Sequence, residues 1–385
     1  MKASSNDKVS VVMSAFNHAP YVGAAIESVL SQCHENIEFL IADDGSSDGT
    51  ADVISQYKDP RITFLPSRIN RGACTSTNDL IKMASGEFLC IINSDDIWPS
   101  TSKINNQLKI LKSLNHVVAV FGRASYMNET GKPLQKEGLE GGFVFDQANR
   151  NRGEWLEHFF MLGNCLCHPS IMIRKNYYDK HGYYKNELRQ VPDFEMWIRL
   201  VKQYDIYVSD ETYVCFRLVK GKNTSSNLGK NFARIVNEHY LVNKSFFAGI
   251  SDETFIMGFS HHFKNSEAAT RNLLEIEKML LFFNDKSVFS YTNQIIGLEK
   301  IYDMLTNEVS REKLLKHYGI DDHWIHEKSS EILALCEHTW IEPEVARLRS
   351  DNILLKQKII SMEMSSSWKV TLPFRAIMNF LCHKK

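Results

Sequence analysis

Two adjacent carboxylates, Asp95 and Asp96, follow an apolar run at residues 88–92 that is short enough to be one buried strand. Adjacent acids at a buried strand end repel each other and lose hydration. They are tolerated when a cation lies between them and an anionic group such as a diphosphate. Ligands of open α/β sheets bind beyond the carboxyl ends of the strands. The pair therefore predicts a divalent metal that holds a nucleotide diphosphate, although an acidic turn in which Asp96 caps the next helix also fits these residues.

A second acidic strand end, Asp43-Asp44-Gly45-Ser46, follows the apolar run at residues 37–42. A carboxylate can accept hydrogen bonds from a base N–H or from ribose hydroxyls. One strand end would then serve the nucleoside and the other the diphosphate and its metal. A turn in which Ser46 or Asp48 caps the next helix is compatible with this role. The segment also begins like a calcium loop, but Ser55 stands where that loop requires a bidentate glutamate.

The third constellation, residues 191–200, places Asp193 after Pro192 at the expected start of a helix. Asp193 could be an N-cap that stabilises the helix by about 1 kcal/mol. It could also be a general base at the mouth of a cleft, with Met196 and Trp197 packed beneath it. The spacing is compatible with both interpretations.

Strands and helices alternate over residues 8–125, which predicts a mostly parallel, doubly wound sheet. The expected strands are 9–13, 37–42, 62–65, 88–92 and 117–121. Gly86 suits the end of the expected helix 75–85. The turn after the first strand has neither the glycine pattern of a dinucleotide-binding domain nor that of a P-loop.

Beyond residue 126 the pattern loosens, with expected strands at 170–173 and 213–216 and one helix at 193–204, and residues after 230 read as helical. The segment 342–364 has an apolar seam with Asn352, which fits a parallel two-stranded coil in a homodimer or a core-facing helix. Residues 365–385 contain no acid and interleave basic with aromatic residues. This composition is typical of an interfacial membrane segment, although a packed terminal helix also fits.

Composition sets further bounds. A chain of 385 residues with 43% hydrophobic residues can bury a large core, and a net charge of −1 argues against a general nucleic-acid binder. The eight cysteines are scattered, which predicts reduced thiols in a cytosol. Cys165, Cys167 and His168 are expected to pack, with His168 shaping the acceptor side, because neighbouring strand residues face opposite sides. We expect a soluble or peripheral protein without a signal peptide or membrane span.

Several motifs in register resemble glycosyltransferase family 2 of the GT-A fold. The resemblance covers roughly residues 8–228 and rests on residues 9–17, 43–50, 70–72, 86–87, 94–96, 163–170, 172–174 and 193–199. It implies inverting sugar transfer from a nucleotide-sugar donor, with a UDP- or dTDP-sugar favoured.

The resemblance also implies roles for individual residues at the donor site. Ser14 and Phe16 would lie against the base, and Asp43 would hold base or ribose. Asp95 would contact ribose or assist at the metal, and Asp96 would be the main ligand of Mn²⁺ or Mg²⁺, which acts as a charge sink for the departing diphosphate.

For the acceptor, the resemblance implies that Asp193 takes the proton from the attacking hydroxyl. The sequence departs from the family pattern at Asn93, where a further carboxylate is frequent, at Thr77, where an arginine is frequent, and at Val219, where a histidine is frequent. Candidates for the missing phosphate or acceptor contacts are Arg217, Lys220, Lys222 and Trp197.

We therefore expect a catalytic domain at residues 1–228, a helical region at 229–340, and a coil-like helix with a membrane-associating tail at 341–385. The protein would extend a lipid-linked glycan, such as an O-antigen or capsule precursor, at the cytoplasmic face of a bacterial membrane. A sugar-nucleotide pyrophosphorylase would need a glycine-rich basic loop after the first strand, which residues 14–17 do not provide. The other alternative is a catalytically inactive scaffold subunit, to which Asn93 points.

Overall fold

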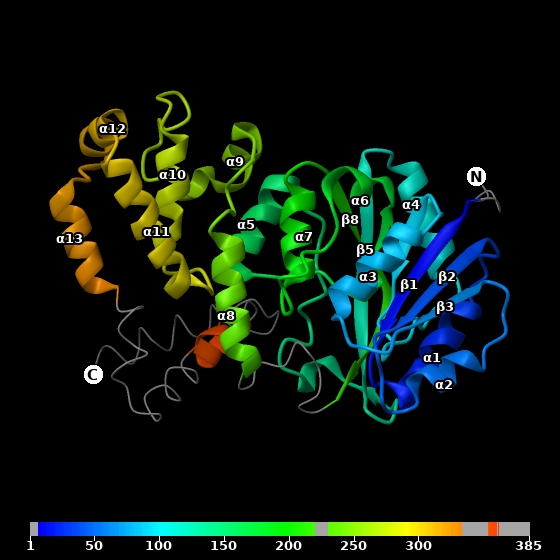
Figure 1. Ribbon diagram of the computed structural model, residues 1–385. Helices are drawn as coiled ribbons and strands as arrows, with labels where there is room; N and C mark the ends of the chain where they lie inside the picture. The colour runs from blue at the N-terminus through cyan, green and yellow to red at the C-terminus, as the bar shows by residue number, and fades with distance from the viewer. Residues whose placement is uncertain (1–6, 220–229, 333–352, 360, 362–385) are drawn as a thin grey trace, which may run out of the picture.

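The computed structural model describes residues 7–219, 230–332, 353–359 and 361 (Figure 1). A mixed sheet of eight strands has the order β3-β2-β1-β4-β7-β5-β6, with β8 paired to β5. The strands are β1 (Val9–Ala15), β2 (Ile37–Asp43), β3 (Ile62–Pro66), β4 (Phe88–Ile91), β5 (Val117–Asn128), β6 (Pro133–Leu134), β7 (Met172–Arg174) and β8 (Asp205–Leu218).

The N-terminal half of this sheet is parallel, with β1 between β2 and β4. Ala15, the last residue of β1, pairs with Asp43, the last residue of β2. On the other side Val12 pairs with Ile91 at the end of β4. The three strands therefore deliver the loops that follow them to one edge of the sheet, which is where α/β sheets bind ligands.

Helices cover both faces of the sheet. They are α1 (Ala19–Leu30), α2 (Thr50–Ser55), α3 (Ala73–Met83), α4 (Lys103–Ser113), α5 (Arg152–Leu162), α6 (Asn176–His181) and α7 (Pro192–Val201). Side chains alternate between the faces along each strand. Val11 and Met13 of β1 pack in one apolar cluster with α1, α2 and α4, whereas Val12 packs in a second cluster with α3, α5 and α7.

Residues 230–332 form a helical region beside this sheet, on the left of Figure 1. Its helices are α8 (Lys230–Asn243), α9 (Asp252–Phe259), α10 (Leu274–Leu280), α11 (Ser290–Leu305), α12 (Glu308–Tyr318) and α13 (Asp322–Glu331). Short 3-10 turns are η1 (Lys136–Gly138), η2 (His168–Ser170), η3 (Ser260–His262) and η4 (Leu281–Phe283). The second apolar cluster continues from the sheet into α8–α12, so both parts share one core.

The architecture confirms the predicted fold class: a GT-A-like α/β sheet followed by a helical region. Some expected elements differ. Helix α3 ends at Met83 rather than at residue 85, and Gly86 instead lies against β1, where a Cβ atom would be 2.7 Å from the Ser10 backbone nitrogen. The expected strand at 170–173 begins at Met172, because residues 168–170 form η2. Helices α5 and α6 were not predicted.

No helix among the described residues is long and apolar enough to cross a bilayer. Of the expected coil segment, residues 353–359 and 361 are described and helical, with Leu355 and Ile359 of the seam exposed. The tail at 365–385 lies outside the described residues.

Candidate active site

Asp96 is a buried carboxylate that two neighbouring groups hold in place. The Arg217 backbone N–H donates to its Oδ1 at 2.9 Å, and the Asn93 side-chain amide donates to its Oδ2 at 2.9 Å. The N-cap of α4 is Ser102, so the interpretation of Asp96 as the cap of that helix is wrong. Burial, together with the charge of Asp95, raises the pKa of Asp96 well above its usual range.

Asp95 lies near the side chains of His18 and Arg217. Burial raises the pKa of Asp95, and the nearby His18 and Arg217 offset only part of this effect. The Arg217 guanidinium donates to the carbonyl oxygens of Asp95, Asn128 and Glu129 at 2.8, 3.3 and 3.1 Å. Arg217 is therefore fixed next to both carboxylates. Lys220 and Lys222, the other phosphate candidates, lie outside the described residues.

His18 is a neighbour of the acidic pair to which the sequence analysis gave no role. Its Nδ1 lies 2.8 Å from the Ser94 hydroxyl, directly before Asp95. Its position in the turn after the first strand was visible in the sequence, but only the pairing of β1 with β4 shows that this turn reaches Ser94.

Asp43 is the last residue of β2, on the other side of β1 from the acidic pair. It is 1% exposed, its Oδ2 accepts the Ser46 N–H at 3.0 Å, and its Oδ1 has no hydrogen-bond partner among the described residues. A buried acceptor without a partner is costly unless a ligand satisfies it. Asp43 also lines a cavity of about 480 Å³ together with Arg71 and Ser76. Asp43 is thus placed to accept a hydrogen bond from a bound molecule.

The predicted base contacts lie at the end of β1. Ser14 is half-buried and Phe16 is 43% exposed. Asn17 has a positive φ of 54°, and its N–H donates to the Ser46 hydroxyl at 2.9 Å. An exposed aromatic ring on such a fixed turn offers a surface on which a base can stack.

Asp44 and Asp48 hold the surrounding loops. Asp44 accepts the backbone N–H groups of Arg71 and Gly72 at 2.9 and 2.8 Å, so it fixes the start of α3. Asp48 accepts the N–H of Thr50 in the first turn of α2 and that of Ala19 in the first turn of α1, each at 3.0 Å. The second acidic strand end therefore combines one carboxylate that has an oxygen without a partner among the described residues, Asp43, with two that hold the loops.

Asp193 lies in the first turn of α7, where Val191 is the N-cap, so the interpretation of Asp193 as N-cap is wrong. Its Oδ2 accepts the Asn164 side-chain amide at 2.9 Å, and its Oδ1 accepts the Phe194 N–H at 2.8 Å. Both oxygens are thus oriented, and the side chain is half-buried. Asn164 belongs to the 163–170 motif but received no role from the sequence.

Trp197 is fully buried, with its ring centroid 4.9 Å from that of Phe121. The prediction of a direct phosphate or acceptor contact by Trp197 is therefore wrong for this conformation. His168 also packs: its Nε2 lies 3.0 Å from the Tyr184 hydroxyl, and its ring is 5.9 Å from Trp197. Within the described chain His168 joins no metal-ligating group of three.

Residues 165–168 lie near both the acidic pair and Asp193. The Cys167 thiol is close enough to Asp96 for that charge to add to the raised pKa that burial gives the thiol. Burial lowers the pKa of His168, and the nearby Asp193 partly offsets this. Cys167 thus lies near Asp96, and the adjacent His168 lies near Asp193.

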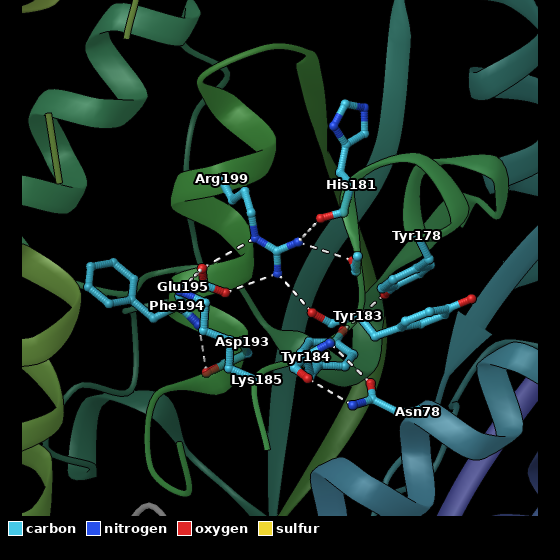
Figure 2. Close-up of polar contacts among 11 residues, drawn as sticks. Asn78, Tyr178, His181, Tyr183, Tyr184, Lys185, Asp193, Phe194, Glu195 and Arg199 are labelled. Carbon is cyan, nitrogen blue, oxygen red and sulfur yellow. Dashed lines mark hydrogen bonds and ion pairs between the residues drawn. The ribbon is translucent and has the colours of Figure 1, made fainter. Parts of the chain in front are cut away.

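Figure 2 shows how the loop before α7 is fastened. The Arg199 guanidinium donates to the carbonyl oxygens of His181, Gly182 and Tyr183 at 2.5, 3.1 and 2.9 Å. Glu195 holds this guanidinium from the same helix at 3.0 Å. The guanidinium of the motif residue Arg199 is therefore used to hold this loop against α7.

Asn78 of α3 fastens the next part of the same loop. Its amide donates to the Tyr184 carbonyl at 2.8 Å and accepts the Tyr184 N–H at 3.0 Å. This pair ties α3, which lies at the second acidic strand end, to the segment that leads into α7.

Glu238 of α8 fixes the last residues before α7. Its carboxylate accepts the backbone N–H groups of Arg189, Gln190 and Val191 at 3.0, 2.7 and 3.1 Å. The sequence analysis missed this residue, because the partners lie 47 to 49 positions away and no local pattern links them. The helical region thus contacts the chain directly before Asp193.

Known proteins that are similar to this chain are glycosyltransferases. The family "Glycosyl transferase family 2" matches residues 10–174. An Escherichia coli protein, UDP-Glc:alpha-D-GlcNAc-diphosphoundecaprenol beta-1,3-glucosyltransferase WfaP, is 38% identical over 182 residues, which are 46% of this chain and 67% of the relative. WfgD, an E. coli protein described by the same activity, is 26% identical over 59% of this chain and 83% of that protein.

Longer proteins match as well. An uncharacterised glycosyltransferase of Rickettsia felis is 30% identical over 254 residues, which are 64% of this chain but 39% of the relative. Among solved structures, S. aureus TarS has a TM-score of 0.51 at 15% identity, covering 87% of this chain and 55% of TarS. The fold, the order of the motifs and these relatives together show that this chain belongs to glycosyltransferase family 2, whose members transfer sugars from nucleotide-sugar donors.

Proposed function

We propose that this protein transfers a sugar from a UDP-sugar, with inversion, to a hydroxyl group of a lipid-linked glycan. The observation that carries the proposal is the buried Asp43 Oδ1, which has no hydrogen-bond partner among the described residues. Asp43 ends β2, and β1 separates that strand from β4, which is followed by the acidic pair. A nucleoside with a diphosphate has the groups that these two positions would bind. The names of WfaP and WfgD support UDP-glucose and a diphosphoundecaprenol-linked acceptor as the first candidates.

The acidic pair fits a divalent cation. Asp95 and Asp96 both have raised pKa values because burial penalises two adjacent negative charges, and a cation would remove that penalty. Carboxylate oxygens are the ligands that Mg²⁺ and Mn²⁺ prefer. Asp96 would be the main ligand and Asp95 would assist. When bound, the ion would neutralise charge on the departing diphosphate.

Asp193 would act as the general base. In the proposed reaction the acceptor oxygen forms a bond to the anomeric carbon, the bond from that carbon to the diphosphate breaks, and the hydroxyl proton passes to the Asp193 carboxylate. An aspartate suffices because the hydroxyl becomes acidic as its bond to carbon forms. Asn164 and the Phe194 N–H orient the carboxylate for this transfer.

The scaffold alternative rests on Asn93, and the structure gives this residue a positive role. Its amide donates to Asp96 Oδ2, which an aspartate at position 93 could not do when ionised. Asn93 thus positions Asp96, so its presence does not by itself mark a lost site. An activity assay of Asp193→Asn also separates the alternatives, because a scaffold has no turnover to lose.

Two further parts of the proposal concern residues outside or at the edge of the described chain. We place the protein peripherally at the inner face of the cytoplasmic membrane through residues 365–385. Deletion of these residues should shift it from the membrane to the cytosolic fraction, and unchanged partitioning would remove this part. A homodimer through the Asn352 seam predicts that Asn352→Leu changes the sedimentation of the protein.

The first experiment is calorimetric titration with UDP, dTDP, GDP and CMP, each with Mn²⁺ and then with EDTA. We expect UDP to bind in the presence of Mn²⁺, and Asp96→Ala to abolish the metal-dependent part. Binding of another nucleotide would change the donor class. Absence of all nucleotide binding by folded protein would overturn the proposal in favour of the scaffold.

A further inference from the structure

Three metal-ligating side chains converge at the junction of α5 and the helical region. Glu157 lies on α5, and His261 and His262 lie on η3. Glu157 Oε1 is 3.0 Å from His262 Nε2 and 3.4 Å from His261 Nε2. One ligand atom from each of the three lies within 4.8 Å of the others. The cluster is built from chain segments about 100 residues apart.

We propose that Glu157, His261 and His262 bind a divalent transition-metal ion of the zinc type. Imidazole nitrogens with a carboxylate oxygen form a common ligand set for zinc. In a tetrahedral site with such ligands about 2.0–2.1 Å from the metal, neighbouring ligand atoms are about 3.3 Å apart. The two measured separations, 3.0 and 3.4 Å, lie close to this value. A small movement of the side chains would therefore admit the ion.

The Glu157 carboxylate interacts with both imidazoles. Burial would raise the pKa of Glu157, but the hydrogen bond and charge of His262 and the neighbouring His261 hold it below its usual value. The carboxylate is therefore ionised at neutral pH. The alternative is a hydrogen-bonded cluster without metal, in which both imidazoles donate to one carboxylate oxygen. Direct measurement of metal binding separates these possibilities.

The surroundings suggest what such an ion would do. Gly153 of α5 and Gly258 of α9 touch, since a Cβ atom on Gly153 would lie 2.5 Å from the Gly258 nitrogen. Because η3 directly follows α9, the ion would add a second contact between α5 and this part of the helical region. The His261 side chain is 61% exposed, whereas those of Glu157 and His262 are 27% and 19% exposed. Three protein ligands and an exposed side leave a fourth position for water, as in exchangeable rather than closed sites.

The test is titration of the full chain with Zn²⁺, and with Co²⁺ as a spectroscopic probe of tetrahedral geometry. Wild-type protein should bind one equivalent that His261→Ala and Glu157→Gln bind at least ten-fold more weakly. His326→Ala, which removes an exposed histidine of α13, is the matched control and should bind as wild type does. Any zinc that binds at Asp96 should remain in all of these variants.

His261 is exposed, so its loss should not prevent folding. Excess Zn²⁺ should raise the Tm of wild type and of His326→Ala by more than that of His261→Ala, since a ligand stabilises the state that binds it. Equal zinc stoichiometry and affinity in wild type and His261→Ala would overturn the proposal. So would Co²⁺ spectra unchanged by Glu157→Gln.

Discussion

The Glu238 carboxylate accepts the Val191 N–H at 3.1 Å, two residues before the proposed base Asp193. A residue of the helical region therefore sets the backbone at the start of α7. The same carboxylate also accepts the two preceding N–H groups. Glu238 is 5% exposed, so water cannot easily replace these contacts.

Replacement of Glu238 by alanine should move Asp193 and lower kcat by about ten-fold or more, because small displacements of a catalytic group are costly. KM for the donor should change little, since the loops proposed to bind the donor follow β1, β2 and β4. Glu238→Gln keeps one acceptor oxygen and should recover part of the rate. Steady-state kinetics with exposed Glu253→Gln as control checks this, and an equal rise in donor KM would contradict a positioning role.

Replacement of Asp193 by asparagine should lower kcat by about 10²–10⁴-fold, which is the usual contribution of a general base. The Asn164 contact would have to rearrange, but UDP binding should stay unchanged. Turnover assays and calorimetry on the same sample provide the measurement. Wild-type turnover in this variant would assign the base to another residue.

Replacement of Asn93 by aspartate should remove a donor from Asp96 and place a third negative charge beside it. In EDTA the free energy of unfolding should fall by about 1–3 kcal/mol, the usual penalty for an unsatisfied buried group. Mn²⁺ should restore most of this loss. Urea unfolding with EDTA and with Mn²⁺ tests the point, and equal stability of both proteins in EDTA would count against the proposed contact.

His239 predicts loss of stability in acid. Burial lowers its pKa to about 4, so between pH 6.5 and pH 4 the unfolded chain binds more protons than the folded one. Stability is therefore complete above pH 6.5 and falls as the pH decreases through this window, by up to about 3 kcal/mol from this residue. His239→Phe should flatten the dependence of Tm on pH, whereas exposed His326→Phe should not. Parallel slopes for all three proteins would show that another group is responsible.

The first 125 residues were predictable because each strand there is a short apolar run and each helix has one apolar face. The same periodicity placed Asp43 and Asp95 at or after the carboxyl ends of two strands, β2 and β4, which lie on either side of β1. Helix α5 was missed because its apolar residues, such as Trp155 and Phe160, are not confined to one narrow stripe. The helix is buried between the sheet and the helical region, so its pattern reflects two partners that no local rule reveals.

The contacts that orient Asp193 could not be predicted for a related reason. Asn164 is 29 positions away from it, and Glu238 acts through Val191, 47 positions away. Each is a single polar residue with no repeating pattern. Their roles depend on tertiary packing, whereas the role of Asp96 depends on the end of its own strand.

The shared core has a consequence for how this molecule can be divided. The Phe160 ring of α5 lies between 5.0 and 6.1 Å from the rings of Phe246, Phe247, Phe259 and Phe282, all from the helical region. A chain cut after residue 228 would leave this aromatic cluster open to water and remove the partner of Val191. We therefore expect that the segment with the family motifs does not fold independently. Heat or urea should unfold it together with residues 230–332 in one cooperative transition.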